Sequence, residues 1–595
     1  MLHELIHSSD ASHRRQLAEL LNEAPFKAID QTDRKQKQHR IYEQLRTLNR
    51  WAGSGSELVS DRKRLFGALE FAATISPSLF HVAQAHYGVC LTTIQKLGIP
   101  SPQLDQIIRD LDNLSSAAVI LITELGVGCS HLAVATRADY EPESDEFVLS
   151  TPDKAACKIM ANVALQGVAK TAVVFAQLWS GGENHGLFPF VVQIRDEQQI
   201  HAGVHIKTLR GESALGMDYG IVWFDEVRIP RANWLADSAT IQDEGRFSDL
   251  PANVERRLVR SLAAIANAST ATAVGAAAAA RACIWTALRY AGQRKTMGPL
   301  GAGRPILDFR NQQTLLLGAL AEAYVISNLA RQLVDGPAAA TMTSSIATAP
   351  WAAINRFGAM TKAITVTGAG EVIRNCRRAS GAHGCLGANR FGEYEHLVVA
   401  YASAGGDNQL ILIEIGRELA SNANPTNEGT QPPHNLEDIQ SLRQLAAFEE
   451  RRQFDRATSG LTAADLSNPD LFAVWNSRLP AVIDLAKTHG CRVALERFLD
   501  SARPADADAD ADFEVVHALA TIYAVNNFGG GLTYELRDHA LARSFDVVMK
   551  HLDRALDAFD LSAERVSAPM AQDDYVAAYM QDELPVAACV ETSIA

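Results

Sequence analysis

The sequence predicts a mainly α-helical fold with an antiparallel β-domain inserted between helical regions. Three observations lead to this fold class: helical spacing of apolar residues before residue 120, short β-branched runs from 121 to 240, and a return of helical spacing after 250. At 595 residues the chain is too long for one hydrophobic core. We therefore expect an N-terminal helical domain over 1–120, a β-domain over 121–240, a helical bundle over 241–421, a linker over 422–438 and a C-terminal helical domain over 439–595.

The first two regions are distinguished by the period of their apolar residues. Arg64–Ala73 and Leu104–Leu114 carry apolar residues at three- and four-residue spacing, which is typical of helices. The β-domain is expected from short runs that turn residues separate, namely Glu146–Ser150, Thr171–Gln177, Phe188–Ile194 and Gly220–Phe224.

The bundle contains an uncharged stretch, Ala263–Ala280, that resembles a membrane span in length only. It is built from Ala, Ser, Thr and Gly, and such small residues insert poorly into a bilayer. We interpret it as a helix packed on all sides inside the bundle, so no membrane association is expected.

Two polar segments lie farther along the chain. Asn422–His434 is dense in Pro, Asn and Gly, which is typical of a linker between domains. The alternating repeat Ala505–Asp512 offers no cage for a metal ion, so we expect a solvated loop there.

Composition excludes several classes of function. A net charge of −14 argues against a surface for nucleic acid or anionic membranes, because either would need clustered basic residues. The eight cysteines show no paired spacing, so neither a metal site nor a disulfide scaffold is expected. The N-terminus lacks an apolar signal core and the C-terminal residues ETSIA are no peroxisomal address, so we expect a cytoplasmic protein.

Two segments of the β-region carry specific patterns. Ile122–Gly128 reads ITELGVG, in which the Thr123 hydroxyl and the small residue Gly128 would allow the backbone to pass close to a planar cofactor. Taken alone, this segment is equally well explained as a turn before a strand. Trp223–Asn233 reads WFDEVRIPRAN, a strand that ends in a turn stopped by proline.

Two further segments belong to the bundle. Arg289–Pro299 reads RYAGQRKTMGP and Pro305–Gln313 reads PILDFRNQQ. Arg294 would offer phosphate a fixed fork of donors, and Gln313 would offer both a donor and an acceptor. Taken singly, each is better explained as an ordinary surface or rim residue.

Together with Gly381–Arg390 and Tyr401–Gln409, these segments resemble the acyl-CoA oxidases in order and spacing. The resemblance covers the chain from about residue 60. It implies a β-barrel-like middle domain, a four-helix bundle, an extra C-terminal helical domain, bound FAD and at least a homodimer, since the family's flavin sites are shared between subunits. The cofactor contacts that it implies are Thr123, Gly128, Arg294, Gln313, Gly381, Gly384 and Asp407.

The chain departs from the family pattern at its catalytic position. The family's F-E-G carries the glutamate that removes the α-proton of the acyl thioester, and Gly405 stands there in this chain. Asp407 matches a residue that is already acidic in the family, so it is no spare base. Met160 replaces an aromatic residue that usually lies by the flavin, and Cys385 replaces a tyrosine. The catalytic base is therefore unknown from the sequence.

Three hypotheses follow from this departure. The chain is an oxidase of an acyl thioester, on CoA or an acyl carrier protein, that uses O2 by a variant mechanism. Alternatively, it is a flavin-dependent oxygenase on the same fold. In the third hypothesis it is a non-catalytic FAD-binding partner subunit. Fatty acid metabolism is expected from the resemblance, and the lost base alone suggests a specialised biosynthetic pathway.

Overall fold

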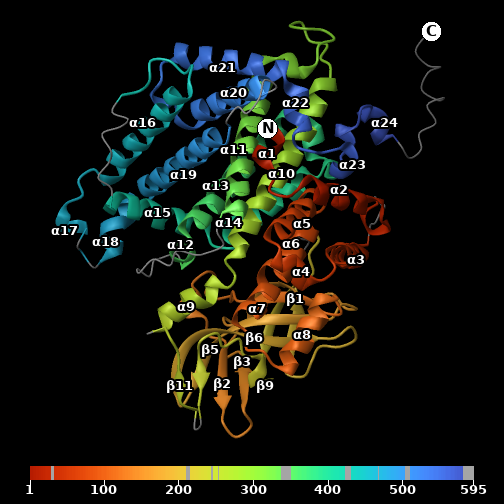
Figure 1. The fold of residues 1–595 in the computed structure, drawn as a ribbon, viewed down its shortest axis with the longest axis vertical. Helices are drawn as coiled ribbons and strands as arrows, with labels where there is room; N and C mark the ends of the chain where they lie inside the picture. The colour runs from red at the N-terminus through yellow and green to blue at the C-terminus, as the bar shows by residue number, and fades with distance from the viewer. Residues whose placement is uncertain are drawn as a thin grey trace.

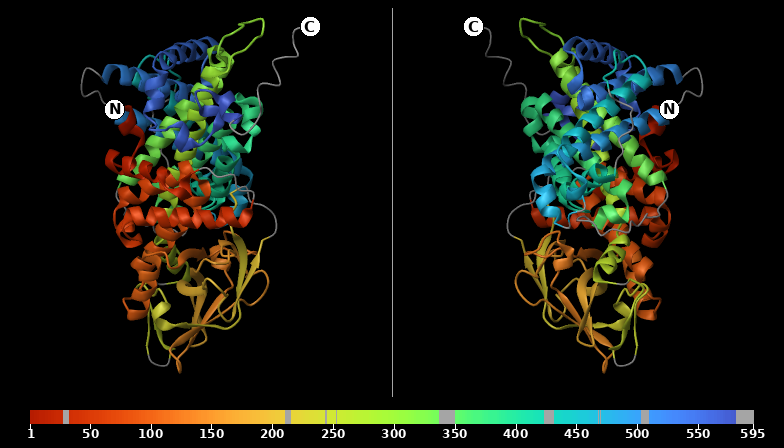
Figure 2. Two further views of the ribbon diagram at one scale, coloured as in Figure 1. Left: turned by 90° about the vertical axis from the view of Figure 1, so that its right-hand side faces the viewer. Right: turned by 90° about the vertical axis from the view of Figure 1, so that its left-hand side faces the viewer.

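The computed structural model describes residues 1–27, 33–209, 215–242, 245–251, 253–336, 350–422, 431–466, 468, 470–502 and 509–580. The β-domain forms one end of the long axis and helices build the rest (Figure 1). The two side views show the same division (Figure 2). The predicted fold class, mainly α with an inserted β-domain, is confirmed. The domain limits given above stay a prediction.

The N-terminal helices form one layer between the β-domain and the long central helices. A serine cap starts α6, because the Ser76 hydroxyl accepts a hydrogen bond from the Leu79 amide. The chain then continues without a break into a π-helix, η3 (Gln84–Leu91). The α-helices of this layer are α1 (Leu2–Ile6), α2 (Ala11–Glu19), α3 (Arg34–Ala52), α4 (Gly55–Ser60), α5 (Arg62–Ile75), α6 (Pro77–Ala83), α7 (Thr92–Leu97) and α8 (Pro102–Asp112).

The β-domain contains two main sheets and a short hairpin. The larger sheet has the order β1-β5-β2-β3-β9 with β6 also paired to β5, and the smaller has the order β4-β8-β7. The strands are β1 (Ala117–Leu121), β2 (Arg137–Glu141), β3 (Glu146–Ser150), β4 (Lys158–Asn162), β5 (Lys170–Ser180), β6 (Glu183–Arg195), β7 (Val204–Thr208), β8 (Tyr219–Phe224), β9 (Val227–Pro230), β10 (Thr240–Ile241) and β11 (Phe247–Ser248).

The larger sheet is mixed, which corrects the expectation of a wholly antiparallel domain. Strand β5 pairs parallel with β1 and with β2, and antiparallel with β6. The turn residues in the sequence indicate hairpins between successive strands only. These turn residues do not indicate the parallel pairing of β1 with β5, because the two strands are distant in the chain and are not joined by a hairpin.

The bundle is built on three long helices, with α14 and α15 packed along α13. Helix α10 is the one described helix that is long and apolar enough to cross a membrane, and its apolar window is 100% buried. Its small residues permit close packing, since a Cβ on Gly275 would lie 2.4 Å from Phe80 Cζ. The prediction of a core helix is confirmed. The helices are α9 (Val254–Ala263), α10 (Asn267–Gln293), α11 (Arg310–Asp335), α12 (Pro350–Ile354), α13 (Arg356–Ala379), α14 (Phe391–Ser403) and α15 (Asn408–Asn422).

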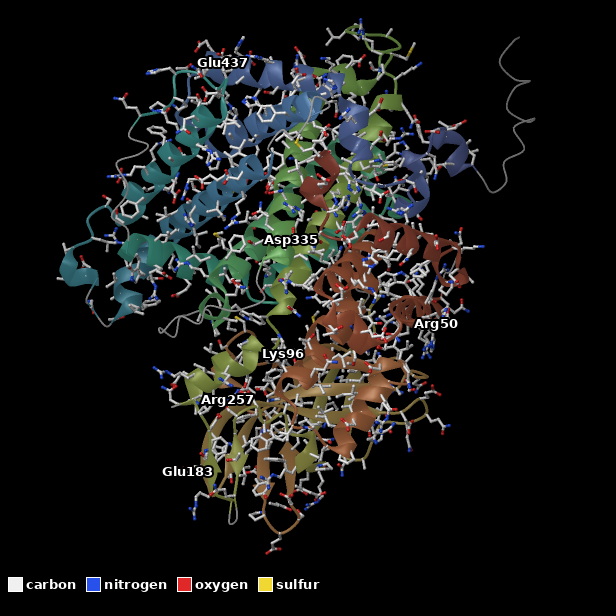
Figure 3. The ribbon with its side chains drawn as sticks, in the orientation of Figure 1. Arg50, Lys96, Glu183, Arg257, Asp335 and Glu437 are labelled. Carbon is white, nitrogen blue, oxygen red and sulfur yellow. The ribbon has the colours of Figure 1, made fainter. Side chains whose placement is uncertain are left out.

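Arg257 on α9 and Lys96 on α7 lie where the helices meet the β-domain (Figure 3). The guanidinium of Arg257 bonds to Asp249 at 3.0 Å and to Asp237 at 3.1 Å. Because Arg257 is 1% exposed, these bonds supply the partners that a buried charge requires. They fix α9 against the sheet.

The C-terminal helices pack against α11 and α13. Residues 423–430 of the predicted linker, 503–508 of the acidic repeat, and the residues after 580 lie outside the described residues. At the end of the repeat Asp512 is 6% exposed and pairs with Arg554, so this residue is not solvated as expected. The helices are α16 (Ile439–Thr458), α17 (Ala463–Leu466), α18 (Leu471–Trp475), α19 (Leu479–Ser501), α20 (Ala509–Phe528), α21 (Tyr534–Lys550), α22 (Leu552–Asp557), α23 (Ala563–Val566) and α24 (Tyr575–Tyr579).

Candidate active site

The loop after β1, which carries Thr123 and Gly128, is held by a buried ion pair. Lys158 Nζ lies 2.9 Å from Glu124 Oε1 and also donates to the carbonyl oxygens of Ile122 and Phe175. The two side chains are 0% and 1% exposed. Burial lowers the pKa of Lys158 to about 8, and Glu124 opposes that shift. No pattern in the sequence indicates that Glu124 and Lys158 form an ion pair.

A Lys158→Met variant should lose roughly 3–5 kcal/mol of unfolding free energy, because it leaves the Glu124 carboxylate buried without its cation. Urea denaturation measures the loss. Lys154→Met is the matched control, since Lys154 lies four residues away in the same segment and is exposed. Equal midpoints for the two variants would contradict the role given to the pair.

The outer face of this loop fits a planar cofactor. Leu125 is 52% exposed and Met160, on neighbouring β4, is 53% exposed. Gly128 has φ +56° and no atom within 4 Å of a built Cβ. The Thr123 hydroxyl has no hydrogen-bond partner among the described residues. An apolar surface beside a free hydroxyl and an open glycine is suited to cover a flavin ring.

Arg294 and Gln313 lie on opposite sides of the connection between α10 and α11. Arg294 ends α10, and its carbonyl oxygen accepts a hydrogen bond of 2.8 Å from the Ile306 amide, a few residues before α11. Gln313 is 7% exposed, and its side-chain oxygen is buried without a partner. A buried acceptor or donor left unpaired costs about 1–3 kcal/mol, so a ligand that completes it binds with a gain. This donor set fits the polar part of a dinucleotide.

The turn after α13 lies beside the same end of α10. The ring of His383, which lies in this turn, is 4.9 Å from that of Tyr290 in the last turn of α10, and its Nδ1 lies 2.9 Å from the Tyr579 hydroxyl. Gly381 has φ +56° and an open Cβ position. A Cβ on Gly384 would lie 2.4 Å from the Arg377 carbonyl oxygen, so packing alone requires that glycine.

The loop between α14 and α15 carries Gly405 and Asp407. The Asp407 carboxylate accepts hydrogen bonds from the amides of Gln409 at 2.9 Å and Leu410 at 3.2 Å, so it caps α15. Beneath the loop, the fully buried Lys362 donates to Asn408 Oδ1 at 2.8 Å and to the Gly406 carbonyl oxygen. Asp407 therefore has a structural task, and a cofactor contact by it stays a prediction.

The space at Gly405 is polar but holds no carboxylate nearby. The three heavy atoms nearest its built Cβ are Thr272 Oγ1 at 3.4 Å, Ala268 O at 3.7 Å and the Ala268 carbonyl carbon at 3.8 Å. Gly405 has φ +69°, a backbone conformation that glycine adopts without cost. A Cβ at this position would therefore meet only ordinary van der Waals contacts, with a hydroxyl and a backbone carbonyl as its neighbours.

A series of contacts joins this loop to the β-domain. The Tyr401 hydroxyl lies 2.9 Å from Nδ1 of His81, whose ring meets the edge of Tyr219 at 5.9 Å. Tyr219 pairs with Asn162 on β4, the strand that also carries Met160. These contacts link α14, which precedes the Gly405 loop, to β4, which lies beside the Thr123 loop. No motif in the sequence pointed to His81 or Asn162.

The predicted residues therefore fall into two groups. Thr123, Gly128 and Gly405 lie on loops next to α14 or β4, whereas Arg294, Gln313 and Gly381 gather at the far end of α10. Among the described residues, no hydrogen bond or ring contact joins the two groups. The described part of the chain also contains no group of three or more His, Cys, Asp or Glu side chains arranged for a metal ion.

Comparison with known proteins finds that this chain is similar to acyl-CoA oxidases. The model of the acyl-CoA oxidase C-alpha1 domain matches residues 265–420. Acyl-coenzyme A oxidase 2, peroxisomal, of Arabidopsis thaliana is 25% identical over 88% of this chain and 82% of its own length. Peroxisomal acyl-coenzyme A oxidase 1 of the same plant is 30% identical over 52% of this chain and 47% of its own length.

Solved structures share the fold. Acyl-CoA oxidase 3 of Yarrowia lipolytica superposes with a TM-score of 0.79 at 20% identity, covering 100% of this chain and 94% of that chain. Acyl-CoA oxidase-2 of Caenorhabditis elegans, bound with FAD, ascaroside-CoA and ATP, gives 0.79 at 18% identity, with 97% and 92% covered. The predicted cytoplasmic location is wrong by this evidence, because the relatives from Arabidopsis and Homo sapiens are named peroxisomal.

Proposed function

We propose that this chain, which is similar to the acyl-CoA oxidases, a family of FAD-dependent oxidoreductases, binds FAD and oxidises an acyl thioester with O2 as acceptor. The acyl group is carried on CoA or on an acyl carrier protein. The observation that supports the proposal is the exposed apolar face of the Thr123 loop, together with the polar atoms that surround Gly405. Proton removal there proceeds without the family's glutamate.

When bound, FAD supplies the acceptor for the β-hydrogen and passes its electrons to O2. The residues of the chain hold and shield it. Leu125 and Met160 would cover the flavin ring and exclude water, and the Thr123 hydroxyl would be available to donate a hydrogen bond to it. Arg294 and Gln313 bind the pyrophosphate and adenosine part. Glu124 and Lys158 keep the first of these loops in place.

The products of one turnover test this function. Purified protein should contain FAD and release one H2O2 for each double bond formed in the acyl chain. Oxygen from isotopically labelled O2 in the organic product would identify an oxygenase instead. A flavin that no acyl thioester reduces without air would identify a non-catalytic FAD-binding subunit.

We also propose a homodimer in which the loop after Arg294 reaches the flavin site of the partner. This proposal is supported by the separation of the two residue groups and by the exposure of the loop. Met297 is 82% exposed and Leu300 is 89% exposed, although both are large and apolar.

Replacing Met297 and Leu300 together by Lys should shift the protein toward monomers and lower its FAD content, because charges would enter an apolar contact. Light scattering and the ratio of flavin to protein absorbance measure the two effects. The control replaces Phe472 by Lys, since Phe472 is 75% exposed on α18, outside both residue groups. Equal dimer and FAD content in both proteins would contradict the proposal.

A further inference from the structure

Buried polar groups near Gly405 have hydrogen-bonding capacity that is unused. Thr272 is 1% exposed, and its Oγ1 has no hydrogen-bond partner. Gln84 is 4% exposed and donates from Nε2 to the Ala268 carbonyl oxygen at 3.3 Å, while its Oε1 has no partner. That carbonyl oxygen lies 3.7 Å from the built Cβ of Gly405. Buried polar atoms left unpaired at one point indicate a place for a polar ligand.

An imidazole lies on the same helix face as Gln84. His81 precedes Gln84 by three residues, so the two side chains project from adjacent turns of one continuous helix. The helix changes to π geometry at Gln84, a feature that is frequent at functional sites. Tyr401 bonds to His81 Nδ1 and precedes Gly405 by four residues. His81 therefore contacts α14 through Tyr401 and lies one helical turn before Gln84, whose side chain reaches the Ala268 carbonyl oxygen near Gly405.

The protonation state of the His81 imidazole is suited to accepting a proton. Its second nitrogen, Nε2, has no hydrogen-bond partner among the described residues, and the side chain is only partly buried. Burial lowers the pKa of His81 to about 4, and the negative charge of Asp218 opposes the shift. The ring is therefore neutral near pH 7, with a lone pair available. Tyr401 and Tyr219 are the ionisable groups in contact with it, and both are uncharged there because burial raises the pKa of each.

We propose that His81 accepts the α-proton of the acyl thioester in place of the missing glutamate, and that Tyr401 positions its ring. The inference rests on the function proposed above. The α C–H bond breaks and its proton passes to Nε2, giving an imidazolium. The electron pair of that bond forms the new double bond, while the β-hydrogen leaves with its electrons to the bound flavin. Tyr401 accepts from Nδ1–H, and Thr272 and Gln84 face the substrate beside the α-carbon.

The test separates proton removal from turnover. Acetoacetyl-CoA ionises readily at its α-carbon, and its enolate beside an oxidised flavin gives a long-wavelength absorption band. In the FAD-loaded protein, His81→Gln should slow the appearance of this band by roughly 10²-fold or more. Tyr401→Phe should slow it less, because the base remains but its ring is less well held. FAD content and the affinity for a non-ionisable acyl-CoA thioether should stay unchanged.

His86→Gln is the matched control. His86 lies on the same helix and is also neutral, since burial lowers its pKa to about 4, but its Nδ1 accepts from the Ala118 amide on β1. This variant should form the band at the wild-type rate. If His81→Gln forms the band as fast as wild type, or loses only affinity for the acyl chain, the inference is wrong. Wild-type protein that takes up no FAD, or whose flavin no acyl thioester reduces, overturns the proposed function itself.

Discussion

Placing a glutamate at position 405 should restore rapid proton removal to a protein that has lost His81. In the His81→Gln background, adding Gly405→Glu should raise the rate of flavin reduction by a saturated acyl-CoA roughly 10²–10⁴-fold. The reason is geometric, because a carboxylate would then stand at the position where the family pattern has its base. Stopped-flow reduction without air measures the rate. In the otherwise wild-type protein the gain in the rate of flavin reduction should be smaller, because His81 already accepts the proton.

The Gly405→Glu substitution has an energetic cost, and a matched control is available. A non-glycine residue at φ +69° destabilises the loop by about 1–2 kcal/mol. Thr272 Oγ1 lies 3.4 Å from the built Cβ, an ordinary contact, so the added Cβ itself meets no clash. Gly405→Gln has the same size and the same backbone strain but no basic oxygen. Equal rates for the Glu and Gln variants would show that position 405 is not beside the α-carbon.

Removing Lys362 should unfold the loop that carries Gly405. In Lys362→Met, the Gly406 carbonyl oxygen and Asn408 Oδ1 both lose their buried donor, which costs about 1–3 kcal/mol each. The expected loss is therefore about 2–6 kcal/mol, visible in urea denaturation. Lys487→Met is the control, because Lys487 is exposed on α19. Flavin reduction should fall as well, since α14 and α15 are no longer held at the site.

The contribution of Lys362 should depend on pH. Burial lowers its pKa from the ordinary value of 10.5 to about 7, and Asp407 opposes that shift. Between these values the unfolded chain binds a proton that the folded chain does not, so the unfolding free energy rises with pH. The advantage of wild type over Lys362→Met should therefore grow from pH 7 to pH 9, by at most about 1.4 kcal/mol per unit. An advantage that shrinks over this range would contradict a depressed pKa.

Much of the fold was predictable because local patterns of residues in the sequence indicate it. The small, uncharged residues of Ala263–Ala280 indicated the core helix, and the change of period near residue 121 indicated the β-domain. The parallel pairing of β5 with β1 and β2 was not predictable, because no short-range signal specifies strands distant in the chain.

The candidate site was predictable only where residues follow a motif. Thr123 and Gly405 were singled out in this way, and their roles at the site stay predictions. His81 was not found, because its relation to Gly405 runs through Tyr401 on another helix, a contact with a sequence separation of 320 residues. Asp407 and Gly384 match the motif, but helix capping and close packing already explain them.

The most direct test of the central claim is the visible spectrum of the purified protein, recorded before and after an acyl-CoA is added without air. The account predicts a flavin band at about one FAD per chain that bleaches on addition, although residue 405 carries no carboxylate. A colourless protein that takes up no added FAD would contradict it, as would a flavin band that no acyl thioester bleaches.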